Sequence, residues 1–95
     1  MTDPSLLVLA SLADGDKHGY AMMEDIQRFA GVRLGPGTLY GAITRLEQSG
    51  FIAPAASDNR RRPYRITTTG KRSLEERLAQ LNQVVRTGLR RLREA

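Results

Sequence analysis

The sequence contains no cysteine and a single histidine, His18. Without thiols the chain forms no disulfide and carries out no thiolate chemistry, and one histidine does not build a metal site by itself. No apolar run approaches the roughly 20 residues of a membrane span, and the start of the chain lacks the pattern of a signal peptide. These absences predict a cytoplasmic protein with no metal, no cofactor and no membrane partner.

The acidic residues do not form a catalytic group. Five carboxylates are scattered over expected turns and helix faces: Asp14, Asp16, Glu24, Asp25 and Glu47. Glu24 and Asp25 are adjacent and therefore diverge on a helix, and no serine is placed near His18 as a nucleophile. A chain of 95 residues also has too small a core for a buried catalytic chamber. We therefore do not expect an enzyme.

Positive charge is concentrated late in the chain and is nearly all arginine. Residues 1–59 carry four Lys or Arg against seven Asp or Glu, a net charge of −3. Residues 60–95 carry eleven against three, a net charge of +8, which brings the whole chain to +5. Guanidinium groups suit phosphates and guanine edges, so the composition favours a polyanion as partner. A plain solubilising surface is the alternative.

Two helices are predicted in the first thirty residues. Asp3 is a fitting N-cap and Pro4 a fitting first helical residue, and the helix that follows to Leu12 is apolar nearly all round. After a polar turn, a second helix runs from about His18 to Ala30. Its expected inward stripe consists of Tyr20, Met23, Ile26, Gln27 and Phe29. The triplet Val32, Arg33 and Leu34 alternates, and we expect a very short strand there.

The stretch from Leu34 to Ile52 predicts a third helix over residues 36–49. Thr38 offers a capping oxygen, and four apolar residues recur at helical spacing: Leu39, Ala42, Ile43 and Leu46. The opposite face carries small, hydroxyl-bearing or cationic side chains. A helix of this kind can enter a DNA major groove. An ordinary amphipathic surface helix is the alternative.

A two-stranded hairpin is expected next, with strands over residues 51–56 and 63–67 and three arginines, Arg60, Arg61 and Arg62, at its tip. Pro54 restricts the first strand to an edge. Three helices followed by such a hairpin form the winged helix-turn-helix plan. We therefore predict a mainly α fold with a small β-hairpin, a DNA-binding domain over residues 1–67 and a dimerisation helix over residues 68–95.

The last helix carries a heptad seam. Leu74, Leu78, Leu81, Val85 and Leu92 are spaced by four, three, four and seven residues, with Gly88 in the missing slot. One alternative is that the seam covers the domain's own core, which fits its first half. The other is pairing with a second copy, with the first helix of either chain alongside. Gly88 and the arginines around it predict a frayed or splayed end.

Three segments resemble the PadR family of bacterial transcriptional regulators. They are LLVLASLADGDKHGYAMMEDI at residues 6–26, PGTLYGAITRLEQSGFI at 36–52 and RRRPYRITTTGKR at 60–72. The resemblance implies a dimeric winged-helix repressor that leaves its operator when a small effector, often aromatic or drug-like, binds or when a signal alters the geometry of the dimer. A single helix after the wing is similar to the short branch of the family. Since no aromatic follows Tyr64, we do not expect a pocket walled by aromatic side chains between the subunits.

From these patterns we predict the residues that bind double-stranded DNA and those that form the homodimer. The DNA contacts are Gly37, Thr38, Tyr40, Thr44, Arg45, Arg60, Arg61, Arg62, Arg65, Lys71 and Arg72. The dimer contacts are Leu6, Leu9, Leu74, Leu78, Leu81, Val85 and Leu92. For Tyr40 the alternatives are a ring packed on the second helix with its hydroxyl on a phosphate, and a role in packing alone. The alternative function is a winged helix that binds an acidic protein partner.

Overall fold

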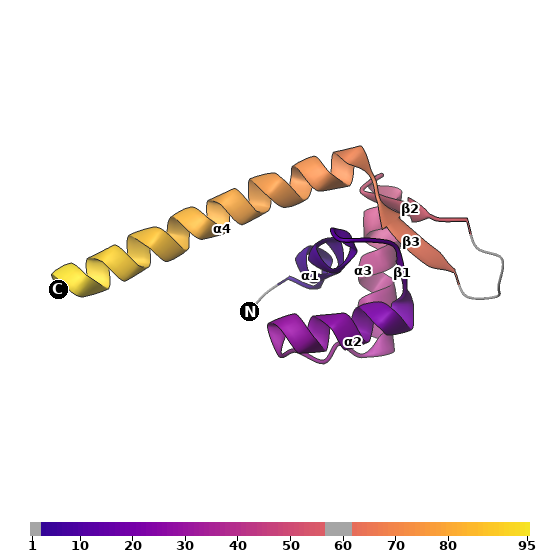
Figure 1. The fold of residues 1–95 in the computed structure, drawn as a ribbon, viewed down its shortest axis with the longest axis horizontal. Helices are drawn as coiled ribbons and strands as arrows, with labels where there is room; N and C mark the ends of the chain where they lie inside the picture. The colour runs from indigo at the N-terminus through magenta and orange to yellow at the C-terminus, as the bar shows by residue number, and fades with distance from the viewer. Residues whose placement is uncertain (1–2, 57–61) are drawn as a thin grey trace.

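The structure, a computed structural model, describes residues 3–56 and 62–95. These residues form a small helical domain from which the last helix extends (Figure 1). In chain order the elements are α1 (Pro4–Leu12), β1 (Lys17–His18), α2 (Gly19–Ala30), α3 (Pro36–Gln48), β2 (Ile52–Pro54), β3 (Pro63–Ile66) and α4 (Thr68–Glu94). The molecule measures 56 × 26 × 20 Å, with α4 along its length. The mainly α fold with a small hairpin is confirmed.

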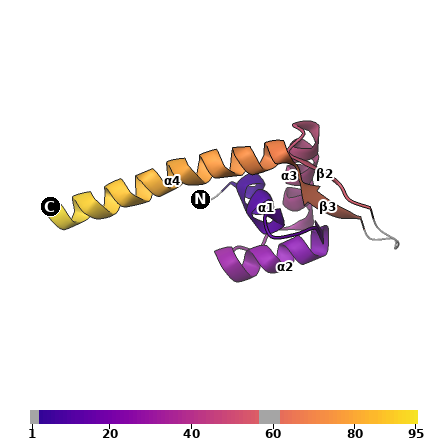
Figure 2. The same cartoon turned by 45° about the horizontal axis from the view of Figure 1, so that its top comes forward.

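Helix α1 is the centre of the core, with α2, α3 and α4 packed around it (Figures 1 and 2). Its apolar side chains Leu6, Leu7, Val8, Leu9 and Leu12 are all buried. Asp3 caps the helix as predicted, because its carboxylate accepts a hydrogen bond from the backbone N–H of Ser5 at 3.1 Å. A helix that is apolar nearly all round is thus covered nearly all round.

Polar groups join α1 to α2. The hydroxyl of Ser11 is buried and donates to the Asp25 carboxylate at 2.7 Å, so its polarity is satisfied inside the domain. The ammonium group of Lys17 donates to the Ser11 carbonyl and to the Asp14 carboxylate, both at 2.5 Å. A cation at the carbonyl end of α1 also complements the helix dipole. Lys17 therefore links the end of the turn before α2 to the end of α1 and to Asp14 within the turn.

The sheet has three strands, one more than predicted. β3 is the central strand, with β2 antiparallel on one side and the two-residue β1 antiparallel on the other. Lys17 pairs with Tyr64, and Ile52 pairs with Ile66. β1 carries no alternating pattern of its own, and it becomes a strand because the edge of β3 needs partners for its backbone groups. The predicted strand at residues 32–34 is wrong, because this segment is irregular and simply buries Leu34.

The predicted inward stripe of α2 is largely wrong. The buried side chains are those of Met22 and Ile26, whereas Tyr20 is 61% exposed and Phe29 51% exposed. Gln27 is also exposed, and Met23 is only partly buried. The helix is rotated from the predicted orientation because its start, at buried Gly19, must approach α3 closely. Gly31, with φ 68°, follows the last helical residue, so the predicted end of the helix at Ala30 is confirmed.

Helix α3 begins earlier than its predicted cap. Gly35 is the N-cap and Pro36 occupies the first turn, so Thr38 lies inside the helix and does not cap it. The predicted inward residues Leu39, Ala42, Ile43 and Leu46 are all buried. Gly50 has φ 78°, a left-handed conformation that glycine adopts easily, and it turns the chain into β2.

Helix α4 is continuous from Thr68 to Glu94, so the predicted fraying near Gly88 is not seen. Thr67 caps it by accepting a hydrogen bond from the Gly70 N–H at 3.0 Å. Leu74 is buried in the domain core, which means that the first turns of α4 belong to the domain rather than to a separate unit.

An ion pair joins the start of α1 to α4. The Arg77 guanidinium donates to Asp3 at 2.7 Å. Partial burial raises the pKa of Asp3, but hydrogen bonds from Arg77 and Ser5 and the charges of Arg77 and Arg45 outweigh it, leaving the pKa below its usual value. The folded chain therefore favours the ionised carboxylate.

Replacing Asp3 by alanine is expected to cost about 1 kcal/mol of stability near neutral pH, since a helix cap is lost. Because the folded pKa lies below the unfolded value near 3.8, this stabilisation is present above that value and disappears as the pH falls through the folded pKa. Urea unfolding of wild type and Asp3→Ala should therefore converge in acid. Asp16→Ala, which removes an exposed turn carboxylate with no ion pair among the described residues, should show no such convergence.

Candidate nucleic-acid interface

The outer face of α3 is built from small and hydroxyl-bearing residues. Gly37, Thr44 and Gln48 are exposed and, at 100° per residue, point away from the buried apolar side. Gly41 lies between them and is partly buried. With two glycines on this face, the helix backbone can approach another surface closely. The Thr44 hydroxyl donates to the Tyr40 carbonyl at 2.9 Å, which leaves its lone pairs facing outward as acceptors.

Tyr40 packs against the start of α2 and remains 48% exposed. A Cβ built on Gly19 would lie 2.4 Å from the Tyr40 hydroxyl and 2.8 Å from the ring carbon that bears it. Glycine at position 19 thus makes room for the tyrosine. This arrangement corresponds to the alternative in which the ring lies on the second helix, with the hydroxyl next to the positive N-terminal end of α2.

Arg45 lies on the other flank of α3. Its guanidinium folds back along the helix, where a Cβ on Gly41 would be 3.4 Å from one of its nitrogens. Its charge also reaches Asp3 and contributes to the lowered pKa of that carboxylate. Arg45 and Tyr40 therefore border the exposed face from opposite sides. Thr38 is exposed near the start of the helix.

The structure describes two of the four predicted wing arginines, Arg62 and Arg65. Arg62 is exposed just before β3, and Arg65 is exposed within it, opposite Ala53 of β2. Tyr64 and Ile66 alternate with Arg65 and pack on the core, as the predicted strand pattern required. Arg60 and Arg61 lie outside the described residues.

Lys71 and Arg72 are exposed on the first turn of α4. That turn is fastened to Gly50 and Phe51, which follow the end of α3. The structure therefore brings this pair to the C-terminal end of α3, away from Gly37 and Thr38 at its start (Figure 1).

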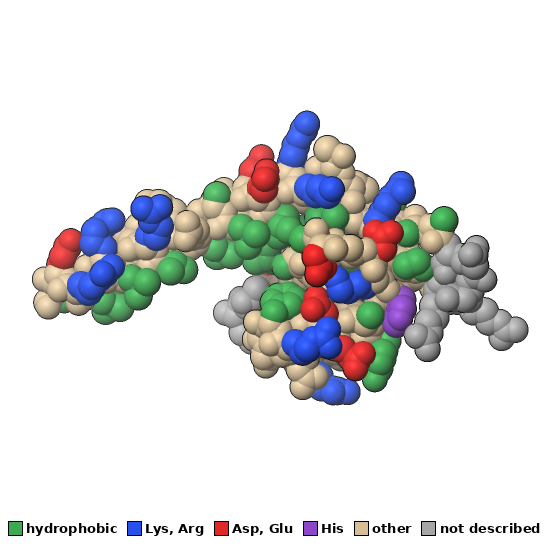
Figure 3. All heavy atoms as spheres, in the orientation of Figure 1, with side chains coloured by type: hydrophobic (Ala, Val, Ile, Leu, Met, Phe, Trp, Pro, Cys, Tyr) green, Lys and Arg blue, Asp and Glu red, His purple; other side chains and the backbone are tan. Residues whose placement is uncertain are grey.

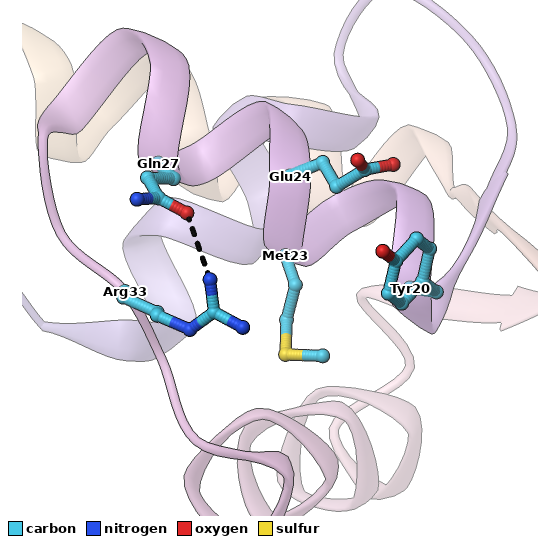
Figure 4. A pocket seen from close by; sticks show the side chains of 5 residues that line it. All are labelled: Tyr20, Met23, Glu24, Gln27 and Arg33. Atoms are coloured by element: carbon cyan, nitrogen blue, oxygen red, sulfur yellow. Dashed lines mark hydrogen bonds between the residues drawn. The ribbon is translucent and has the colours of Figure 1, made fainter.

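Two features of this region were missed by the sequence analysis. Gln48 lies four residues after Thr44 on the same exposed face, and helical spacing could have identified it. The second is a hollow of about 90 Å³ between α2 and the start of α3, lined by Tyr20, Met23, Glu24, Gln27 and Arg33 (Figure 4). Arg33 donates to Gln27 at 3.4 Å, and Met23 points toward α3. Glu24 gives the hollow a negative group, which is unfavourable for phosphate.

The predicted dimer residues fall into two groups. Leu6, Leu9 and Leu74 lie in the core of their own chain, and Leu9 has no exposed surface at all, so a role for these three in binding a partner is not supported. The remaining residues are exposed on α4: Leu78 at 46%, Leu81 at 47%, Val85 at 55% and Leu92 at 76%. Val84 and Leu89 widen this stripe, which we call the seam. Figure 3 shows apolar side chains gathered along one side of α4.

No helix in the described part of the chain is long and apolar enough to span a membrane. Among the same residues, 3–56 and 62–95, no group of three or more His, Asp or Glu is arranged to hold a metal ion.

Comparison with known proteins relates the chain to regulators. A family model described as the transcriptional regulator PadR-like family matches residues 8–76. The transcriptional regulator Rv3488 of Mycobacterium tuberculosis is 33% identical over 84 residues, which are 85% of this chain and 78% of that protein. An uncharacterised 37.1 kDa protein in transposon TN4556 of Streptomyces fradiae is 47% identical over 73 residues, which are 77% of this chain but only 21% of that protein.

A solved structure shares the fold. A PadR family transcription regulator from hypervirulent Clostridium difficile R20291 matches with a TM-score of 0.82 at 23% identity, covering 90% of this chain and 94% of that chain. At this identity the match supports the fold alone.

Proposed function

The chain belongs to the PadR-like family of transcriptional regulators, and from this premise we propose that it represses transcription as a homodimer bound to an inverted-repeat operator. Membership of the family means that the chain is a transcriptional regulator and not an enzyme. The observation that carries the proposal is the exposed face of α3, which has no part in the core and is bordered by Arg45 on one side and Tyr40 on the other. Phosphate contacts would position this face and base contacts would specify the sequence.

The reading head in this proposal is the outer face of α3. Gly37 and Gly41 let the helix backbone come close to the base edges, and the backbone N–H groups of the first turn can bind phosphate. The Thr44 hydroxyl donates its hydrogen bond to the Tyr40 carbonyl. Its oxygen would therefore accept a hydrogen bond from an amino group of adenine or cytosine. Gln48 extends the same row by one turn.

The wing and the flanks supply phosphate contacts. Arg62 and Arg65 on the wing, together with Arg60 and Arg61, would meet the backbone or a narrow minor groove beside the reading head. Tyr40 would place its hydroxyl on a phosphate, and Arg45, Lys71 and Arg72 would add charge along α3. The members of this set that the structure describes all lie outside the hydrophobic core.

The homodimer would form through the seam on α4. Six large apolar side chains there are about half or more exposed, and the described part of the chain offers no surface that covers them. Heptad spacing suits pairing with an identical helix. A two-fold dimer would place its half-sites roughly 34 Å apart, which is one helical turn of DNA. Since α4 has no aromatic residue, a planar aromatic effector between the subunits is not part of the proposal.

Selection from random duplex DNA, followed by sequencing, tests the proposal. The expected product is an inverted repeat with half-sites about 10 base pairs apart, bound with an affinity that falls steeply between about 50 and 200 mM salt. A reporter driven by a promoter carrying that repeat should be less active when the protein is present. Recovery of unrelated sequences held only at low salt would favour the acidic-protein partner instead.

Substitutions on the wing should lower the affinity for all DNA, whereas substitutions on α3 should lower the discrimination between DNA sequences. Arg62→Ala and Arg65→Ala are expected to weaken binding to operator and random DNA alike, each lowering the salt slope by about 1. Thr44→Val and Gln48→Ala should instead lose about 1 to 3 kcal/mol of discrimination between operator and mismatched DNA. Fluorescence anisotropy on both duplexes at several salt concentrations measures the difference. Arg28→Ala, an exposed arginine that pairs with Asp25 on α2, is the charge-matched control and should change neither quantity.

A further inference from the structure

Helix α4 is attached to the domain only along its first third. The first attachment is at its start, where the Thr67 N–H donates to the Phe51 carbonyl at 3.0 Å and the Thr67 hydroxyl donates to the Gly50 carbonyl at 2.7 Å. Gly70 lies against the same Phe51 carbonyl. These bonds fix the position at which α4 leaves the domain, and they act as a pivot.

The second attachment is the ion pair between Asp3 and Arg77. Asp3 is held in place because one oxygen caps α1 while the other accepts from the Arg77 guanidinium at 2.7 Å. Between the pivot and this pair, buried Leu74 rests on the core. After Arg77, every residue of α4 is exposed except Thr87, which is partly buried. The ion pair is thus the last polar link between the domain and α4 among the described residues.

The seam begins where this attachment ends. Leu78, the first seam residue outside the core, directly follows Arg77. From Thr68 to Arg77 the helix runs about 13 Å, and from Arg77 to Glu94 about 25 Å. A displacement at Arg77 is therefore amplified about threefold at the far end of the helix. The ion pair fixes the angle between α4 and the rest of the domain. This angle sets the orientation of the domain relative to a partner bound along residues 78–92.

We propose that Asp3 and Arg77 are positioning residues that set which spacing between half-sites the dimer accepts. This inference rests on the proposed function, because it requires a homodimer that reads two half-sites. The pair holds each reading head at one angle to the paired helices, and the distance between the two heads follows from that angle.

The test uses operators in which the half-site spacing is changed one base pair at a time. Each step moves a half-site by about 3.4 Å and rotates it by about 35°, which a rigid dimer should reject. For the wild type we expect affinity to fall about tenfold one base pair away from the preferred spacing. For Asp3→Asn and Arg77→Gln the same step should cost only about threefold, the size of change expected for a partly exposed ion pair.

Asparagine caps helices about as well as aspartate, so Asp3→Asn removes the charge and keeps the cap. Arg77→Lys retains an ion pair and should recover much of the wild-type preference. Arg86→Gln removes a charge from α4 without breaking an ion pair among the described residues, and it should keep the wild-type profile. A merely structural role would lower affinity equally at every spacing. Identical spacing profiles for wild type, Asp3→Asn and Arg77→Gln would overturn the inference.

A measurement without DNA separates this inference from the proposed function. Because the chain has no cysteine, Arg28→Cys provides one spin-label site in each subunit. Double electron–electron resonance should give a narrow distance distribution between the two labels, and Asp3→Asn should broaden it. Equal widths would overturn the positioning role while leaving the homodimer intact. No distance between subunits in the wild-type background would overturn the homodimer and, with it, the inference.

Discussion

Gly70→Ala is expected to destabilise the chain by about 3 kcal/mol, at the upper end for an overpacked site. A Cβ at this position would lie 2.0 Å from the Phe51 carbonyl oxygen and 2.9 Å from the Phe51 carbonyl carbon and a side-chain carbon of Ile66. Two of these atoms are backbone and cannot rotate away. The same carbonyl accepts the Thr67 N–H, so any shift also disturbs the start of α4.

Thermal unfolding followed by circular dichroism measures this effect. For a domain of this size the midpoint should fall by roughly 15 °C. Gly88→Ala is the matched control, because a Cβ on Gly88 meets nothing within 4 Å in its own chain. Alanine is also the better helix former by about 1 kcal/mol, so this variant should hold or raise the midpoint. A Gly70→Ala midpoint equal to that of the wild type would show that the contact with Phe51 is not as close as described.

Leu81→Glu is expected to convert the dimer to a monomer and to weaken operator binding by about 100-fold, the effect of losing an interface hot spot. Leu81 lies in the middle of the seam and is 47% exposed in its own chain. Covering a carboxylate inside an apolar interface without a partner is costly, so the paired state should be lost. The domain core does not depend on Leu81, and the monomer should remain folded.

Light scattering coupled to size-exclusion chromatography gives the mass, and anisotropy on a full operator and on a single half-site gives the affinities. The control is Gln83→Glu, which adds the same charge to the opposite face of α4. It should remain dimeric and bind the operator normally. If Leu81→Glu stays dimeric at micromolar concentration, the seam is not the interface.

Sequence reasoning succeeded where local chemistry decides the structure. The Asp3 cap, the end of α2 at Ala30 and the inward row of α3 follow from single-residue preferences or from an unbroken helical repeat. The same reasoning identified the exposed face of α3, because the residues opposite a buried row must face outward. Whether these residues contact DNA remains a prediction.

It failed where the answer depends on a neighbour in space. Tyr20 and Phe29 are apolar enough to be assigned to the core, but α2 turns Met22 and Ile26 inward instead. β1 is a strand only because β3 lies beside it. Leu9 fits a dimer contact by composition, yet α1 is already covered by three other helices of its own chain.

The central place of β3 has a mechanical consequence. Its two edges are bonded to β2 and to β1, and β1 runs without interruption into Gly19 at the start of α2. The base of the hairpin is therefore paired on both edges, and through Lys17 and His18 it is joined to the start of α2. We therefore expect the wing and α3 to bind a duplex as one unit, without a change in their relative positions.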